Sequence, residues 1–93
     1  MHSCTIPEAS NDRPAELARL RLLARKVALV HGGHQPRVVE LAALVTRIAD
    51  APAQPIAADD VVVLGRLTDD FTPWPEACGS VRALYAGLHA LRS

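Results

Sequence analysis

The sequence predicts an all-α protein, and within that class a small antiparallel four-helix bundle. Three observations lead to this prediction. Apolar residues recur at spacings of three and four along several segments, which is the pattern of amphipathic helices. Proline and glycine residues separate these segments and mark where helices begin and end. The chain has 93 residues, of which 49% are hydrophobic, so a single domain with one core is expected.

The first predicted helix begins near Pro14, a residue type favoured in a first helical turn, and runs to about Val30. One face of this helix is apolar. That face consists of Leu17, Leu20, Leu23, Ala24 and Val27. The sequence His31-Gly32-Gly33 is expected to end the helix, because glycine readily adopts the left-handed conformation that terminates helices.

The second predicted helix runs from Pro36 to about Asp50. Its apolar face is expected to contain Val38, Leu41, Leu44, Val45 and Ile48. Residues 51–55 then form a linker of a length that is usual between helices.

The third element, from Ala57 to Asp70, contains three consecutive valines at 61–63, a composition typical of strands. Two facts favour a helix. The chain offers no second strand to pair with, and this segment is long for a strand.

The fourth helix is expected to begin at Thr72, a good N-cap, with Pro73 in its first turn and Glu76 near its positive end. Its apolar stripe is expected to contain Ala77, Val81, Leu84, Leu88 and Leu91. The sequence therefore divides into a flexible N-terminal arm, residues 1–13, and a four-helix domain, residues 14–93.

Composition excludes several classes of function. Lys plus Arg equals Asp plus Glu, 10 of each, so the chain has no general attraction to nucleic acid or to anionic membranes. No apolar run approaches the roughly 20 residues that cross a bilayer. No secretory sequence follows Met1, and Cys4 and Cys78 form no motif, so a cytoplasmic protein with reduced thiols is expected.

Two stretches carry a more specific pattern. The first, ARKVALVHGGHQP at 24–36, is followed by Val39-Glu40-Leu41. The second, LGRLTDDFTPWPEAC at 64–78, leads into RALYAGL at 82–88. Both stretches resemble the hemerythrin-like repair-of-iron-centres family, and the second is the more specific. The resemblance extends from about Leu17 to Asp50 and from Val61 to the end of the chain.

In that family a four-helix bundle holds two irons between histidine and carboxylate ligands, and its members are implicated in restoring iron–sulfur clusters damaged by nitric oxide or oxidants. The resemblance places two of the ligand histidines near Ser10 and Gln54, where this chain has none. The His-x-x-x-Glu segments of the second and fourth helices are also missing, since the chain leaves the second helix at Asp50 and stops at Ser93. All the missing parts belong to one end of the bundle, so the resemblance implies a shortened bundle without its iron-binding half.

The remaining histidines are weak candidates for metal ligands: His31 and His34 in one turn, and His89 near the end of the last helix. We expect His31 and His34 to cap the first helix or to face solvent. Cys78 is expected in the first turn of the fourth helix, as a small buried residue. The alternative is a reactive thiol, because a helix N-terminus favours the thiolate, but a base such as His31 or His89 would have to be brought close by the fold.

These observations predict a metal-free helical interaction module that is not an enzyme and needs no cofactor. The resemblance implies that it functions in a nitrosative or oxidative stress context. Leu22 and Leu29 lie off the main stripe of the first helix, and a shortened bundle would also expose an apolar end. We therefore expect a homodimer through these leucines, or pairing with a full-length relative. Two alternatives stay open: repair of iron–sulfur clusters with iron bound between subunits, and a foldable remnant without function.

Overall fold

The computed structural model describes residues 13–92, and the elements within them are all helical. The four helices are α1 (Arg13–His31), α2 (Arg37–Ala49), α3 (Ala58–Leu67) and α4 (Gly79–Arg92). The prediction of an all-helical chain is confirmed for this range, including a helix over the three valines. The predicted arm, residues 1–13, lies outside the described residues except for Arg13, which begins α1.

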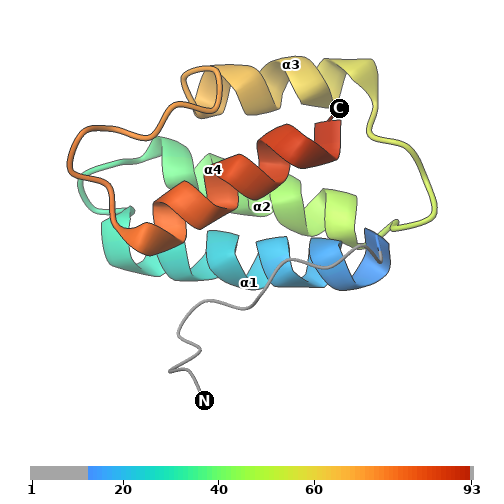
Figure 1. Cartoon of the computed structure of the whole chain (residues 1–93), viewed down its shortest axis with the longest axis horizontal. Coiled ribbons are helices and arrows are strands. Elements are labelled where there is room, and N and C mark those ends of the chain that lie inside the picture. Colours follow the sequence, from blue (N-terminus) through green and yellow to red (C-terminus); the bar gives the residue numbers. More distant parts are fainter. Residues whose placement is uncertain (1–12, 93) are drawn as a thin grey trace.

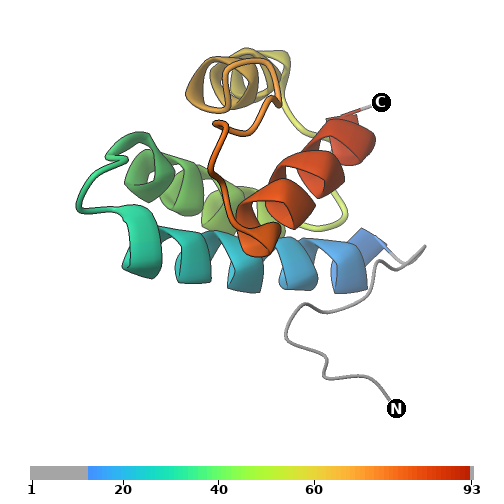
Figure 2. The same ribbon diagram turned by 60° about the vertical axis from the view of Figure 1, so that its left-hand side comes forward.

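The helices pack into a compact unit of 35 × 32 × 19 Å. Figure 1 shows α1 and α2 side by side, joined by a tight turn at the left-hand end, while the connection from α2 to α3 passes around the right-hand end. The main contacts are those of α1 with α2, α1 with α4, and α2 with α3. Figure 2 shows α4 crossing obliquely over α1. Within residues 13–92 no helix is long and apolar enough to cross a membrane.

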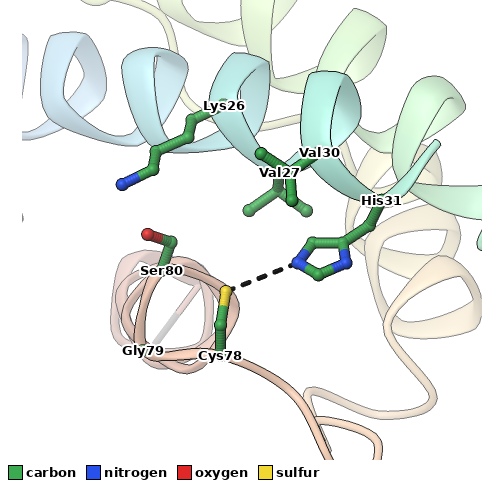
Figure 3. Close-up of a pocket in the computed structure, with 7 residues that line it drawn as sticks. All are labelled: Lys26, Val27, Val30, His31, Cys78, Gly79 and Ser80. Carbon is green, nitrogen blue, oxygen red and sulfur yellow. Dashed lines mark hydrogen bonds between the residues drawn. The ribbon is translucent and has the colours of Figure 1, made fainter.

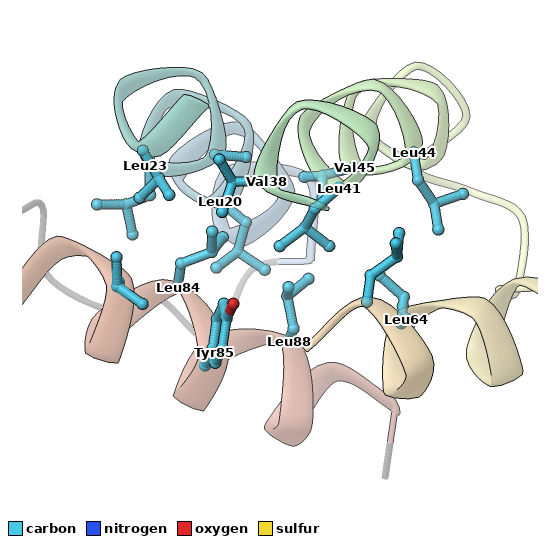
Figure 4. Close-up of a cluster of buried hydrophobic side chains, with 14 of the residues drawn as sticks. Leu20, Leu23, Val38, Leu41, Leu44, Val45, Leu64, Leu84, Tyr85 and Leu88 are labelled. Atoms are coloured by element: carbon cyan, nitrogen blue, oxygen red, sulfur yellow. The ribbon is translucent and has the colours of Figure 1, made fainter. Parts of the chain in front are cut away.

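All four helices contribute to one hydrophobic core (Figure 4). The apolar faces predicted for the first two helices are buried without exception. The side chains at the centre are almost fully enclosed: Leu20, Leu41, Leu64, Leu84 and Leu88. Burying each such side chain stabilises the folded state by roughly 1.5–3 kcal/mol. Helical periodicity therefore identified, in the first two helices, side chains whose burial stabilises the fold.

Helix α3 ends at Leu67, three residues before the predicted end at Asp70. Thr68 is the reason. Its buried hydroxyl donates to the carbonyl of Leu64 (2.7 Å) and accepts from the backbone N–H of Phe71 (2.9 Å). The chain then takes three consecutive residues with positive φ: 52° at Asp69, 58° at Asp70 and 62° at Phe71. Left-handed backbone cannot continue a right-handed helix, so the helix stops here.

Helix α4 begins at Gly79, so the predicted start at Thr72 is wrong. Residues 72–78 are irregular instead. Pro75 accounts for part of this, because the residue before a proline is disfavoured in the helical conformation. The guanidinium of Arg82 holds the irregular segment by donating to the carbonyls of Ala77 (3.2 Å) and Pro75 (3.4 Å).

Two glycines allow close approach of the backbone. No glycine in the described range has a positive φ, so Gly32 does not end α1 in the predicted left-handed conformation. A Cβ at Gly32 would instead lie 2.5 Å from the carbonyl oxygen of Ala28. In α4, a Cβ at Gly87 would lie 2.5 Å from Cδ2 of Leu20, so the absence of a side chain lets α4 pack closely on α1.

The connection between α2 and α3 closes the end of the helices that the sequence predicted to be open and apolar. Arg13 donates from Nε to the carbonyl of Pro52 and from Nη2 to that of Gln54, both at 2.9 Å. Ile56 packs against the core from the same connection, and Ile48 beneath it is buried. This part of the end is therefore covered by the chain itself.

Candidate functional site

A cysteine and a histidine meet at the end of the molecule where α1 stops and α4 starts. Nε2 of His31, the last residue of α1, lies 3.4 Å from Sγ of Cys78, the residue just before α4 (Figure 3). The backbone N–H of Arg82 donates to the carbonyl of Cys78 (3.1 Å), which places Cys78 at the N-cap of α4 rather than in its first turn. The thiol thus lies next to the positive end of the α4 dipole.

A second histidine completes a chain of three polar groups. Nδ1 of His31 lies 3.3 Å from Nε2 of His34. The turn between them is fixed by the backbone N–H groups of His34 and Gln35, which both donate to the carbonyl of His31. The ring of Trp74 packs edge-on against His31, with 5.5 Å between ring centroids. The imidazole of His31 is therefore held between a thiol, a second imidazole and an indole.

Cys78 and His31 line a pocket of about 360 Å³. Its wall on α1 consists of Lys26, Val27 and Val30, and Gly79 and Ser80 complete it on α4. Figure 3 shows the side chain of Lys26 extending toward Ser80, while Sγ of Cys78 faces His31. The pocket thus combines a nucleophile, a potential base, an apolar wall and a cation.

Cys78 is exposed, so the interpretation of a small buried residue is wrong. From the sequence, His31 is a candidate base only if the fold brings it close to Cys78, and the fold does so across 47 positions. The order of the predicted helices could have indicated this pairing. In an antiparallel bundle, the end of the first helix and the start of the fourth lie at the same end.

The histidines do not assemble a di-iron centre with the other described residues. The two ring nitrogens of His31 face different partners, so one ion cannot bind to both. His89 packs against Phe71, with 5.3 Å between ring centroids. The carboxylate of Glu16 is engaged by Arg19, whose Nε donates a hydrogen bond to it (2.9 Å). Within residues 13–92 no three His, Cys, Asp or Glu side chains are grouped to hold a metal ion, and the donor set of a di-iron bundle is therefore not formed there.

Tyr85 packs against Trp74, the residue whose ring contacts His31. Its ring packs edge-on against Trp74, with 6.3 Å between centroids, and the side chain is buried. Burial raises the pKa of the Tyr85 phenol, an effect that the positive charge of Arg37 opposes and the negative charge of Asp69 reinforces.

The second feature of the surface is a groove between α1 and α2, of about 770 Å³. Leu22 and Leu29, which lie off the main stripe of the first helix, line this groove and are 58% and 79% exposed in the single chain. The other lining residues are small or basic: Arg21, Arg25, Ala28, Ala42, Ala43 and Thr46. We call this feature the α1–α2 groove.

Comparisons of the chain with protein-family models, with curated proteins and with solved structures find no match.

Proposed function

We propose that this chain is a metal-free helical module of the hemerythrin-like kind, an antiparallel four-helix bundle that binds a second copy of itself. Its context would be the repair of iron–sulfur clusters under nitrosative or oxidative stress, as the resemblance implies. The observation that carries the self-association is the pair of exposed leucines, Leu22 and Leu29, on the α1–α2 groove.

The helix order supports the hemerythrin-like part of the proposal. The more specific of the resembling stretches, 64–78, spans the last residues of α3 and the irregular segment that leads into α4. The start of α1, the connection from α2 to α3 and the end of α4 all lie toward the right-hand side of Figure 1. The resemblance implies that the iron ligands of the family would lie at that end. In this chain the short connection from α2 to α3 lies there instead.

The spacing of the leucines favours a second copy as the occupant of the groove. Seven residues along a helix span about 10 Å, so an antiparallel pairing of two α1 helices places Leu22 of one copy against Leu29 of the other, twice over. Ala28 and Ala43 beneath them are small enough to admit a partner's leucine side chain.

The expected affinity is modest. The exposed fractions of Leu22 and Leu29 amount to about one and a third leucine side chains per copy. Burying that surface on both copies contributes on the order of 4–8 kcal/mol. Association costs on the order of 4–15 kcal/mol in lost freedom of motion, so neighbouring contacts must contribute as well. We expect a dissociation constant in the micromolar range or above.

Sedimentation equilibrium of the untagged chain, from low to high micromolar concentration, tests the proposal. The double variant Leu22→Gln/Leu29→Gln should weaken self-association at least tenfold. Val62→Gln is the matched control, because Val62 is a 70% exposed apolar residue on α3, outside the groove. A strict monomer at high micromolar concentration would contradict the choice of partner, and a pull-down with a full-length relative would then test the other one.

Metal analysis of the same protein, produced in iron-supplemented medium, tests the metal-free part of the proposal. We expect iron well below one atom per chain in both the monomer and the associated form. Two irons per chain, with the absorption of an oxo-bridged pair, would instead favour iron bound between subunits.

A further inference from the structure

We propose that Cys78 is a site of thiol–disulfide exchange, with His31 as its base, and that it forms mixed disulfides with small disulfides that carry carboxylates. The inference is independent of self-association. No residue that lines the pocket at Cys78 also lines the α1–α2 groove.

The hydrogen-bonded chain of Cys78, His31 and His34 has the order nucleophile, base and orienting group. For Nε2 of His31 to accept the thiol proton, Nδ1 must carry the other proton of the ring and donate it to Nε2 of His34. After the transfer, the imidazolium donates on both sides, to the thiolate and to His34. Both ring nitrogens of His31 are then paired in both protonation states of its imidazole.

The exchange step needs only a disulfide as its second reactant. The proton on Sγ of Cys78 passes to Nε2 of His31, and the sulfur lone pair forms a new S–S bond as the S–S bond of the small disulfide breaks. The proton leaves with the released thiol. Cys78 is oxidised to the disulfide level and one half of the small molecule is reduced to a thiol, so atoms and electrons balance. A free thiol reverses the step.

The surroundings of Cys78 select the kind of disulfide. Lys26 provides a positive charge on the pocket wall, and the first N–H groups of α4 add the positive end of a helix dipole. Both favour carboxylates on the incoming molecule. Val27 and Val30 provide the apolar surface for its carbon chain, and a pocket of about 360 Å³ holds a molecule of the size of a tripeptide thiol.

The experiment uses the full chain with Cys4→Ser, so that Cys78 is the one remaining thiol of the two. Its rate of reaction is followed by absorbance with two probes: dithiobis(nitrobenzoate), which carries two carboxylates, and dithiodipyridine, which carries none. The same chain unfolded in guanidinium at equal pH gives the reference rate for each probe. We expect the folded chain to react faster than the unfolded one, and by a larger factor with the anionic probe.

Substitutions assign the roles. His31→Gln should slow the reaction with both probes about tenfold, which is less than the roughly hundredfold or more that a positioned base contributes in enzymes. Lys26→Met should slow only the anionic probe, about threefold, and added salt should remove the difference. His34→Leu should slow the reaction severalfold while His34→Gln restores it, because the amide oxygen can accept from Nδ1 of His31. His89→Gln, on a histidine that packs against Phe71, is the control.

Oxidised glutathione, a disulfide of an acidic peptide thiol, then tests the product directly. Mass spectrometry of the treated chain should find one glutathione on Cys78 in the unsubstituted protein and much less in His31→Gln. Circular dichroism confirms that each variant is folded. A folded Cys78 that reacts no faster than the unfolded chain would overturn the proposal, as would a folded His31→Gln variant that reacts at the unsubstituted rate.

Discussion

Thr68 offers the sharpest test of how this fold is held together. The residue is 1% exposed, and its hydroxyl joins the last turn of α3 to the left-handed segment that follows. Thr68→Val keeps the shape of the side chain and removes both hydrogen bonds. The carbonyl of Leu64 still accepts from the backbone N–H of residue 68 (3.1 Å), but the hydroxyl no longer accepts from the N–H of Phe71.

The cost follows from these two contacts. Each lost hydrogen bond costs about 1–1.5 kcal/mol, and Thr68→Val removes the one to Leu64 and the one from Phe71. We therefore expect Thr68→Val to lower the free energy of unfolding by about 2–3 kcal/mol. For a domain of this size each kcal/mol corresponds to roughly 4–8 °C in the melting temperature, so a loss of more than 8 °C is expected.

Thermal and urea unfolding of three variants measure this effect. Thr68→Ser keeps the hydroxyl and should recover most of the stability. Thr72→Val is the matched control, because Thr72 is exposed and its hydroxyl makes only a long contact with the carbonyl of Asp70 (3.4 Å). Such surface changes are usually within 0.5 kcal/mol. If Thr68→Val and Thr72→Val melt together, the hydroxyl of Thr68 does not hold the turn.

Two further predictions concern packing and pH. Gly87→Ala should destabilise the protein by about 1–2 kcal/mol, because the new Cβ meets the fully buried Leu20. Gly65→Ala has open space around the new Cβ and should stabilise α3 by about 0.5–1 kcal/mol. Chemical unfolding of both variants measures the two effects, and equal effects would contradict the close contact between α4 and α1. Because the pKa of Tyr85 is raised by folding, its contribution to stability is complete below the ordinary phenol value of 10.0 and is lost as pH rises through the folded value. Tyr85 is the one tyrosine of the chain, so its ultraviolet titration reports this group alone, and an apparent pKa equal to that of the unfolded chain would refute the prediction.

The sequence by itself determined which residues form the helices α1 and α2 and which of their faces are buried. Periodicity alone identified Leu17, Leu20, Leu41 and Val45 as core, because any arrangement that removes these side chains from water must turn that face inward. It also placed Leu22 correctly outside the core. The helix at α3 followed from an elimination: an isolated strand would have had no partner for its backbone groups.

Only the tertiary structure decided the ends of the later helices. Thr72 and Pro73 formed a good local start signal, yet the chain does not become helical until Gly79. The hydroxyl of Thr68 and the left-handed residues after it set the direction in which the chain leaves α3, and local propensities of a few tenths of a kcal/mol do not outweigh such contacts.

The candidate site was likewise decided by the fold. Each of its parts was visible in the sequence, but the pairing of His31 with Cys78 joins the end of α1 to the start of α4 across 47 positions. Sequence patterns report contacts within one helix, where neighbours are three or four residues apart. Contacts between helix ends depend on how the helices cross and on where the connecting segments end. That geometry is set by the packing of the whole core, and it placed an exposed thiol beside an imidazole where local sequence predicted a small buried residue.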